Sequence, residues 1–164
     1  MPVERIAAQP NGDISLPDSS VDLITCFDVL HHIPNVSHII EEFARVLEPG
    51  GLVLLREPIT DMGGNWGSRD RPGLTPHERG IPVSILRRQL VAAGLTIERE
   101  VLHMFPPTLR LWRNGLVPFN NAAITAVDRG VCRLITLRVR YHADTHLQKI
   151  RPAEVAVMAR RSAR

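Results

Sequence analysis

Two adjacent histidines carry the most evident chemistry of this sequence. His31 and His32 follow a short apolar run, and each has an imidazole that can take a proton near neutral pH. An imidazole in reach of a bound hydroxyl group could therefore activate it as a nucleophile. Consecutive side chains point in different directions, so we expect at most one of the two to face a ligand, and His32 is the first choice. The alternative is that both imidazoles cap the turn that follows.

The elements around the histidines are predicted from hydrophobic patterning. The run from Val21 to Phe27 is too short for an isolated helix and rich in branched side chains, which favours a buried strand. From Pro34 onward, apolar residues recur at spacings of three and four, as in an amphipathic helix. A Pro-Gly-Gly sequence at 49–51 is predicted to end that helix, and four apolar residues at 52–55 form a second strand. The pattern predicts a parallel strand–helix–strand unit covered by helices.

The same segments carry a family resemblance. DLITCFDVLHHIPN, followed by EEFARVLEPGGLVLLREP, resembles the fourth strand, next helix and fifth strand of class I S-adenosylmethionine-dependent methyltransferases, in particular methyltransferase type 11. The resemblance implies an α/β fold: a partial Rossmann-like sheet, mostly parallel, with flanking helices and an antiparallel last strand. It begins at about the family's third strand, near residues 3–8, and lacks the N-terminal glycine-rich cofactor motif. The chain thus resembles the C-terminal two thirds of such an enzyme.

Length and composition favour a single domain over residues 1–164. The chain has 44% apolar residues and no internal repeat, enough for one core. Residues 60–80 are polar and rich in glycine and proline, which predicts an acceptor loop or lid, or alternatively a surface insertion.

The remaining segments are predicted to complete the sheet and to cover it. A helix over 82–93 leads to a strand over 95–104 that lies near the sheet edge. Residues 106–150 are predicted to form a helical insertion, which includes a helix over about 121–141. The last strand is expected within 151–161, and its antiparallel direction rests on the resemblance.

The resemblance also implies binding residues beside the two catalytic histidines. Those expected to contact the cofactor, S-adenosylmethionine, are Asp13, Ile14, Phe27, Asp28 and Val29. Those expected to contact the acceptor are Arg56, Glu57, Trp66 and Arg79. Asp13 follows an Asn-Gly pair, so ordinary turn chemistry explains it equally well. A salt bridge to the loop is the alternative for Arg56 and Glu57.

No metal site is predicted from the spacing of potential ligands. His31, His32 and His38 have no acidic residue at a fixed offset, and zinc sites rarely use two adjacent residues. Cys26 and Cys132 stand far apart, which predicts buried thiols rather than a disulfide framework or a cysteine zinc site.

Composition argues against two classes of partner. The net charge is only +3 and aromatic residues make up 4% of the chain, so nucleic-acid binding has no support. No apolar run approaches the roughly 18 residues of a membrane span, and no secretory signal is present, which predicts a cytoplasmic protein.

Two functions are compatible with these observations. One is an S-adenosylmethionine-dependent methyltransferase for a small-molecule or saccharide acceptor, truncated, with the activity of this chain alone left open. The other is a non-catalytic remnant or interaction module. Without its central neighbours, the strand over 21–27 would expose an edge, which favours self-association as a homodimer.

Overall fold

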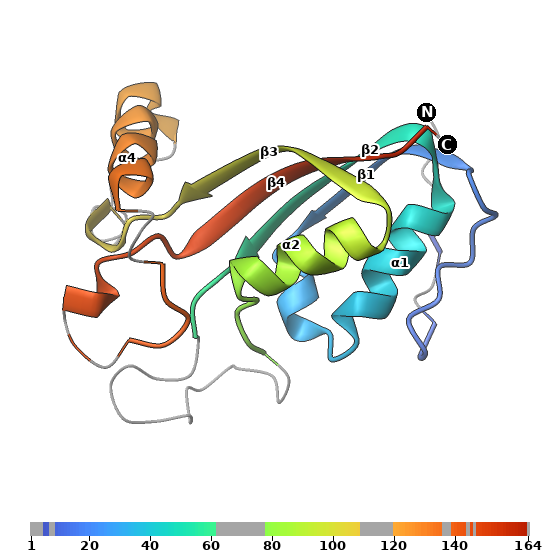
Figure 1. Ribbon diagram of the computed structural model, residues 1–164, viewed down its shortest axis with the longest axis horizontal. Coiled ribbons are helices and arrows are strands. Elements are labelled where there is room, and N and C mark those ends of the chain that lie inside the picture. The colour runs from blue at the N-terminus through green and yellow to red at the C-terminus, as the bar shows by residue number, and fades with distance from the viewer. Residues whose placement is uncertain are drawn as a thin grey trace.

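A single mixed sheet organises the molecule. The computed structural model describes residues 5–6, 9–61, 78–108, 120–135, 139–143, 145 and 147–163. The strands are β1 (Val21–Phe27), β2 (Leu47–Pro58), β3 (Leu95–His103) and β4 (Glu154–Arg161). The helices are α1 (Val36–Val46), α2 (Val83–Ala92) and α4 (Ala122–Leu134), and the 3-10 turns are η1 (Leu30–His32) and η4 (Leu147–Lys149). Helices α1 and α2 lie under one face of the sheet, and α4 stands beyond one end of the opposite face (Figure 1).

The strand order is β1-β2-β4-β3. β1 and β2 run parallel, with Cys26 opposite Leu55 and Phe27 opposite Arg56. β4 lies between β2 and β3 and is antiparallel to both. The predicted parallel unit and the antiparallel last strand are therefore confirmed. Because parallel strands end at the same edge, the residues that follow Phe27 and Arg56 meet there.

The core lies between the sheet and its two covering helices. Alternate residues of β2 and β4 face α1 and α2, as expected for strands with one face turned to the core. Each large apolar side chain that is fully removed from water stabilises the fold by about 1.5–3 kcal/mol. The side chains that meet in this layer include Ile40, Phe43, Val53, Leu55, Leu86, Leu90, Val155 and Val157.

One predicted boundary is wrong, and glycine explains the difference. Helix α1 ends at Val46, and the chain turns at once into β2, before the Pro-Gly-Gly sequence at 49–51. That sequence forms an irregularity inside β2, where the register with β1 shifts. Gly50 has a φ of +83°, and a Cβ at Gly51 would lie 2.9 Å from the Glu48 carbonyl oxygen. The glycines therefore shape a bulged strand rather than a separate turn.

The predicted helical insertion is observed in part. α4 ends at Leu134, short of the predicted 141, and its first turn is capped by the Asn121 side chain, which accepts from Ala123 N at 2.9 Å. Residues 62–77 of the predicted acceptor loop and 109–119 of the insertion lie outside the described residues. Within the described part of the chain, no helix has the length and apolar character needed to cross a membrane.

Candidate functional site

The two histidines stand where β1 and β2 end together. Asp28, the first residue after β1, donates its N–H to the Arg56 carbonyl oxygen at 2.8 Å. Its φ of +56° is left-handed, which turns the chain sharply out of the sheet. One turn of 3-10 helix, η1, follows at once and carries both His31 and His32. The site is thus assembled at the carboxyl edge of a parallel strand pair, where ligands bind in open α/β sheets.

A fully buried carboxylate holds this turn. Glu57, near the end of β2, is 0% exposed. Its Oε1 accepts from the N–H of Val29 at 3.0 Å and of Leu30 at 2.8 Å. Its Oε2 accepts from the His31 N–H at 3.2 Å and lies 2.9 Å from His31 Nδ1. Glu57 therefore fixes both the backbone of η1 and the ring of His31, whose Nε2 is the ring nitrogen not held by this carboxylate.

The two imidazoles occupy different environments. The His31 side chain is buried, whereas that of His32 is 41% exposed, and their ring centroids are 4.0 Å apart. His32 Nδ1 lies 3.6 Å from Glu78 Oε2. The Arg79 N–H donates to the His31 carbonyl oxygen at 3.0 Å, and its guanidinium donates to the Pro34 carbonyl oxygen. These bonds bring the end of the predicted acceptor loop to η1.

Arg56 links the end of β2 to the end of β1. Its guanidinium is bound to the Asp28 carboxylate and lies 5.8 Å from the centroid of the Phe27 ring. The hydrogen bond that Arg56 donates to Asp28 raises the pKa of Arg56. Glu154 and His103, which the sequence analysis missed, approach from β4 and β3: Glu154 Oε2 lies 3.8 Å from Arg56 Nε and 3.7 Å from His103 Nδ1.

Burial changes the charge properties of those two groups. It raises the pKa of the Glu154 carboxyl and lowers the pKa of the His103 imidazole. Both residues reach this rim only because β4 lies between β2 and β3. No local sequence motif indicates that Glu154 and His103 lie near Arg56. Their position follows from the strand order alone.

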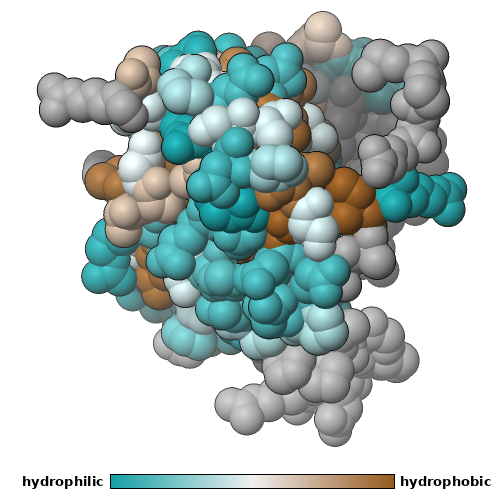
Figure 2. Space-filling view, turned by 90° about the vertical axis from the view of Figure 1, so that its right-hand side faces the viewer, coloured by the Kyte–Doolittle hydropathy of each residue, from teal (hydrophilic) through white to brown (hydrophobic). Residues whose placement is uncertain are grey.

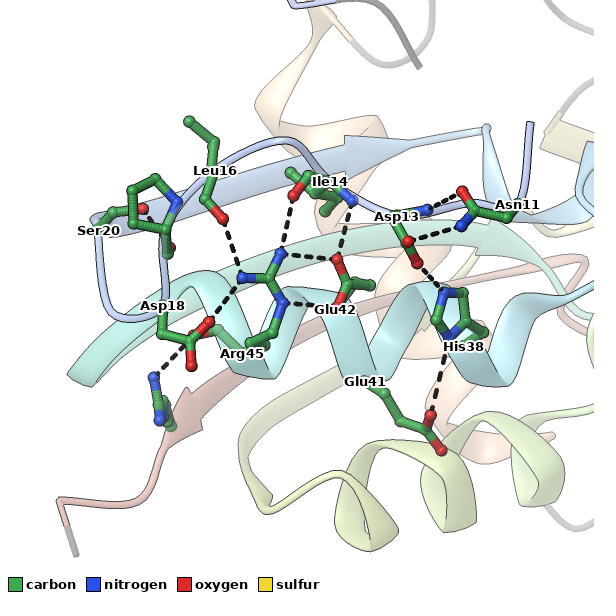
Figure 3. Close-up of polar contacts among 12 residues, drawn as sticks. Asn11, Asp13, Ile14, Leu16, Asp18, Ser20, His38, Glu41, Glu42 and Arg45 are labelled. Atoms are coloured by element: carbon green, nitrogen blue, oxygen red, sulfur yellow. Dashed lines mark hydrogen bonds and ion pairs between the residues drawn. The ribbon is translucent and has the colours of Figure 1, made fainter. Parts of the chain in front are cut away.

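Asp13 and Ile14 lie against α1 (Figure 3). Asp13 Oδ1 is 2.7 Å from His38 Nε2, and the Ile14 N–H donates to Glu42 at 2.8 Å. The Arg45 guanidinium donates to the Ile14 carbonyl oxygen and to Glu42, each at 2.8 Å. The hydrogen bonds from Arg45 lower the pKa of Glu42 to about 2. This network anchors the segment before β1, whereas Phe27, Asp28 and Val29 lie together at the strand exit.

A groove of about 540 Å³ adjoins the strand exit on the face of the sheet below α4. The residues that line it include Phe27 and Arg56 at the strand exit, Met158 of β4 and Arg129 of α4. A larger hollow of about 930 Å³ lies between α2, β3 and α4 and is lined by no residue of η1. No residue of η1 lines the smaller groove either, but that groove shares Phe27 and Arg56 with the strand exit, so of these two cavities it is the one that adjoins the candidate site. Trp66, the remaining predicted contact, lies outside the described residues.

Sequence comparison connects this geometry to a family. Residues 4–55 match the family model described as a methyltransferase domain. A probable S-adenosylmethionine-dependent methyltransferase of Mycolicibacterium smegmatis is 35% identical over 89 residues, which are 53% of this chain and 33% of that protein. The ubiquinone biosynthesis O-methyltransferase of Acinetobacter baumannii is 28% identical over 122 residues, 68% of this chain and 48% of that protein. The chain thus spans less than half the length of these relatives.

Solved structures share the fold. An S-adenosylmethionine-dependent methyltransferase from Mesorhizobium loti superposes with a TM-score of 0.52 at 16% identity, over 90% of this chain and 65% of that chain. The cyclase SpnF superposes with a TM-score of 0.51 at 18% identity, over 93% of this chain and 53% of that chain. Together with the family match, these similarities confirm the resemblance to class I S-adenosylmethionine-dependent methyltransferases and their Rossmann-like fold. The cyclase shows that the fold alone does not determine the reaction.

Proposed function

We propose that this chain forms the acceptor side of an S-adenosylmethionine-dependent methyltransferase that methylates a hydroxyl group of a small molecule, with saccharides as the preferred class. The observation that carries the proposal is the exposed His32 imidazole at the common exit of two parallel strands, beside a His31 ring fixed by buried Glu57. The names of the relatives support the same reaction class.

The residues at the β1 exit have the chemistry that the cofactor needs. Bound S-adenosylmethionine supplies an electrophilic methyl group on a sulfonium. Phe27 and Val29 are 51% and 46% exposed, and they offer apolar surface to an adenosine ring. Between them in sequence, Asp28 supplies a carboxylate that can accept hydrogen bonds from hydroxyl or amino groups. We assign the adenine end to Asp13 and Ile14, although Asp13 must then share its carboxylate with His38.

Proton removal is assigned to His32. Methyl transfer is an in-line displacement, so the protein chiefly aligns the acceptor and, for a hydroxyl, takes its proton. His32 presents a half-exposed imidazole for that step, while His31 is held by Glu57 and positions the turn. Arg56, Arg79 and Trp66 are proposed to contact the acceptor. Glu57 has no exposed surface, so its assignment changes from acceptor contact to positioning through His31.

Transfer of a labelled methyl group to a panel of hydroxylated small molecules tests this proposal. For any acceptor that is methylated, His32→Gln should lower kcat by about 10²–10⁴-fold with a small change in KM, because a general base acts in the transition state. The matched control is His142→Gln, which removes an exposed histidine that lies 3.0 Å from Asp61, and it should retain wild-type kcat. Full activity of His32→Gln would refute the assignment of the base. The assay uses this chain and a fusion that adds the glycine-rich cofactor-binding part of a relative, and absence of methyl transfer by both would refute the proposed reaction.

A second candidate function is self-association through β1. In the described sheet β1 is a terminal strand, and its Leu23 and Phe27 side chains are 49% and 51% exposed. Figure 2, which views the molecule from the end where both termini lie, shows hydrophobic side chains exposed among hydrophilic ones. Strand edges with apolar side chains pair readily with a second copy. Sedimentation should then detect a dimer that Leu23→Lys converts to monomer, and a wild-type monomer at high concentration would contradict this function.

A further inference from the structure

We propose that His31, His32 and Glu78 form a binding site for a divalent transition metal, with Zn²⁺ as the expected ion. Each residue offers one ligand atom, and these atoms all lie within 4.8 Å of one another. Two imidazoles and a carboxylate are ligands that zinc uses at sites with three protein ligands and one open position. The same set also suits other imidazole-binding ions, such as Fe²⁺ and Co²⁺.

The support behind His31 is a second, independent observation. Histidine ligands of metals almost always donate their other ring N–H to a carboxylate or carbonyl, which fixes the tautomer and the ring orientation. His31 Nδ1 lies 2.9 Å from the wholly buried Glu57 carboxylate, and three backbone N–H groups hold that carboxylate in turn. This arrangement presents Nε2 as the ligand atom of His31, on a ring that burial keeps from rotating freely.

The other two ligands need only a small adjustment to reach the same ion. His32 Nδ1 and Glu78 Oε2 are 3.6 Å apart, close to the roughly 3.3 Å between ligand atoms of a tetrahedral zinc site. The backbone bond from Arg79 N–H to the His31 carbonyl oxygen fixes the neighbour of Glu78 beside η1. Closure to a common ion therefore requires side-chain rotation, while the backbone already stands in place.

The structure also explains why ligand spacing gave no sign of this site. His38, the third histidine of the segment, is not part of the site, because its Nε2 lies 2.7 Å from Asp13 Oδ1 near the start of α1. The acidic ligand is Glu78, which follows the long polar segment and has no fixed sequence offset from the histidines. The inference goes beyond the proposed function, since binding of the ion requires neither a methyl donor nor an acceptor. The two roles of His32 exclude each other in one molecule, because an imidazole whose lone pair binds the ion cannot take a proton, so added Zn²⁺ should inhibit any methyl transfer.

Zinc titration of the full chain tests the inference. After removal of any affinity tag and treatment with a chelator, wild-type protein should bind one Zn²⁺ per chain in calorimetry. His32→Gln and Glu78→Gln should each weaken this binding by at least about tenfold, the lower end of the effect found even for residues behind the ligands. The His32 side chain is 41% exposed and that of Glu78 only 10%, so circular dichroism of each variant must show that the fold is unchanged before the affinities are compared.

The control is His142→Gln. His142 Nδ1 lies 3.0 Å from Asp61 Oδ2, and among the described residues this pair is not part of any cluster of three potential metal ligands. It should bind Zn²⁺ with the wild-type affinity. Substitution of Co²⁺ adds a spectroscopic readout, because visible absorption bands should appear in the wild type and be lost in His32→Gln. Absence of stoichiometric binding by the wild type would overturn the inference, as would equal affinities of His32→Gln, Glu78→Gln and wild type.

Discussion

Replacement of Glu57 by glutamine is the most direct test of how the site is held. The two carboxylate oxygens accept from three backbone N–H groups and contact His31 Nδ1, all without exposure to solvent. Glutamine keeps one acceptor oxygen and places an NH₂ donor where the other stood. A switch of tautomer lets the His31 ring accept from the new amide, but the His31 backbone N–H cannot adapt in this way.

The magnitude follows from those contacts. Loss of one hydrogen bond to a charged acceptor costs about 1.5–3 kcal/mol, and the remaining bonds weaken because their acceptor becomes neutral. We therefore expect Glu57→Gln to lower the free energy of unfolding by about 3 kcal/mol, a large part of the stability of a small domain. The carboxylate of Glu100, which forms a more accessible ion pair with Arg87, supplies the control: Glu100→Gln should cost less than about 1 kcal/mol.

Urea unfolding followed by circular dichroism measures both variants. The two midpoints should separate clearly, with Glu57→Gln well below both wild type and Glu100→Gln and with an unchanged denaturant slope. A Glu57→Gln midpoint equal to that of Glu100→Gln would show that the buried carboxylate does not hold η1. The positioning role assigned to Glu57 would then have to be abandoned.

Three further predictions concern other parts of the fold. The hydrogen bonds from the Arg45 guanidinium lower the pKa of Glu42 from 4.5 to about 2. The pair therefore stabilises the fold above pH 4.5 and loses this contribution as the pH falls toward 2. The urea midpoints of wild type and Glu42→Gln should converge over that range. A Cβ at Gly80 would overlap the Thr60 carbonyl oxygen, so Gly80→Ala should lower the free energy of unfolding by about 1–3 kcal/mol. At Gly130 in helix α4 a Cβ meets nothing within 4 Å, so Gly130→Ala should raise the free energy of unfolding by about 0.5–1 kcal/mol in the same assay. Burial raises the pKa of the Cys26 thiol to about 12, so only about one thiol in ten thousand ionises at pH 8, and Cys26 should react with a thiol reagent only after unfolding; rapid labelling of the native protein would contradict this.

The positions of the main elements followed from sequence wherever local pattern and burial agree. α1 has the predicted pattern because helical repeats of apolar residues face one core. β1 lies where it was predicted, but the expectation of a buried strand is wrong: β1 ends the described sheet, and Cys26 is its one buried residue. The start of β2 did not follow, because the bulge around Gly50 and Gly51 depends on the approach of β1 rather than on local preference. The direction of β4 was likewise not derivable from its own residues and required the family resemblance.

The different environments of the two histidines have a cause that lies outside their own segment. His31 is buried and His32 is half exposed because Glu57, on a different strand, captures the η1 backbone together with one of the two rings. Glu57 reaches these N–H groups because the register of β1 and β2 places the end of β2 beside the turn that follows β1. The register of β1 and β2 therefore decides which imidazole reaches a ligand. A change that shifts the register should alter the chemistry of the site even if both histidines remain in the sequence.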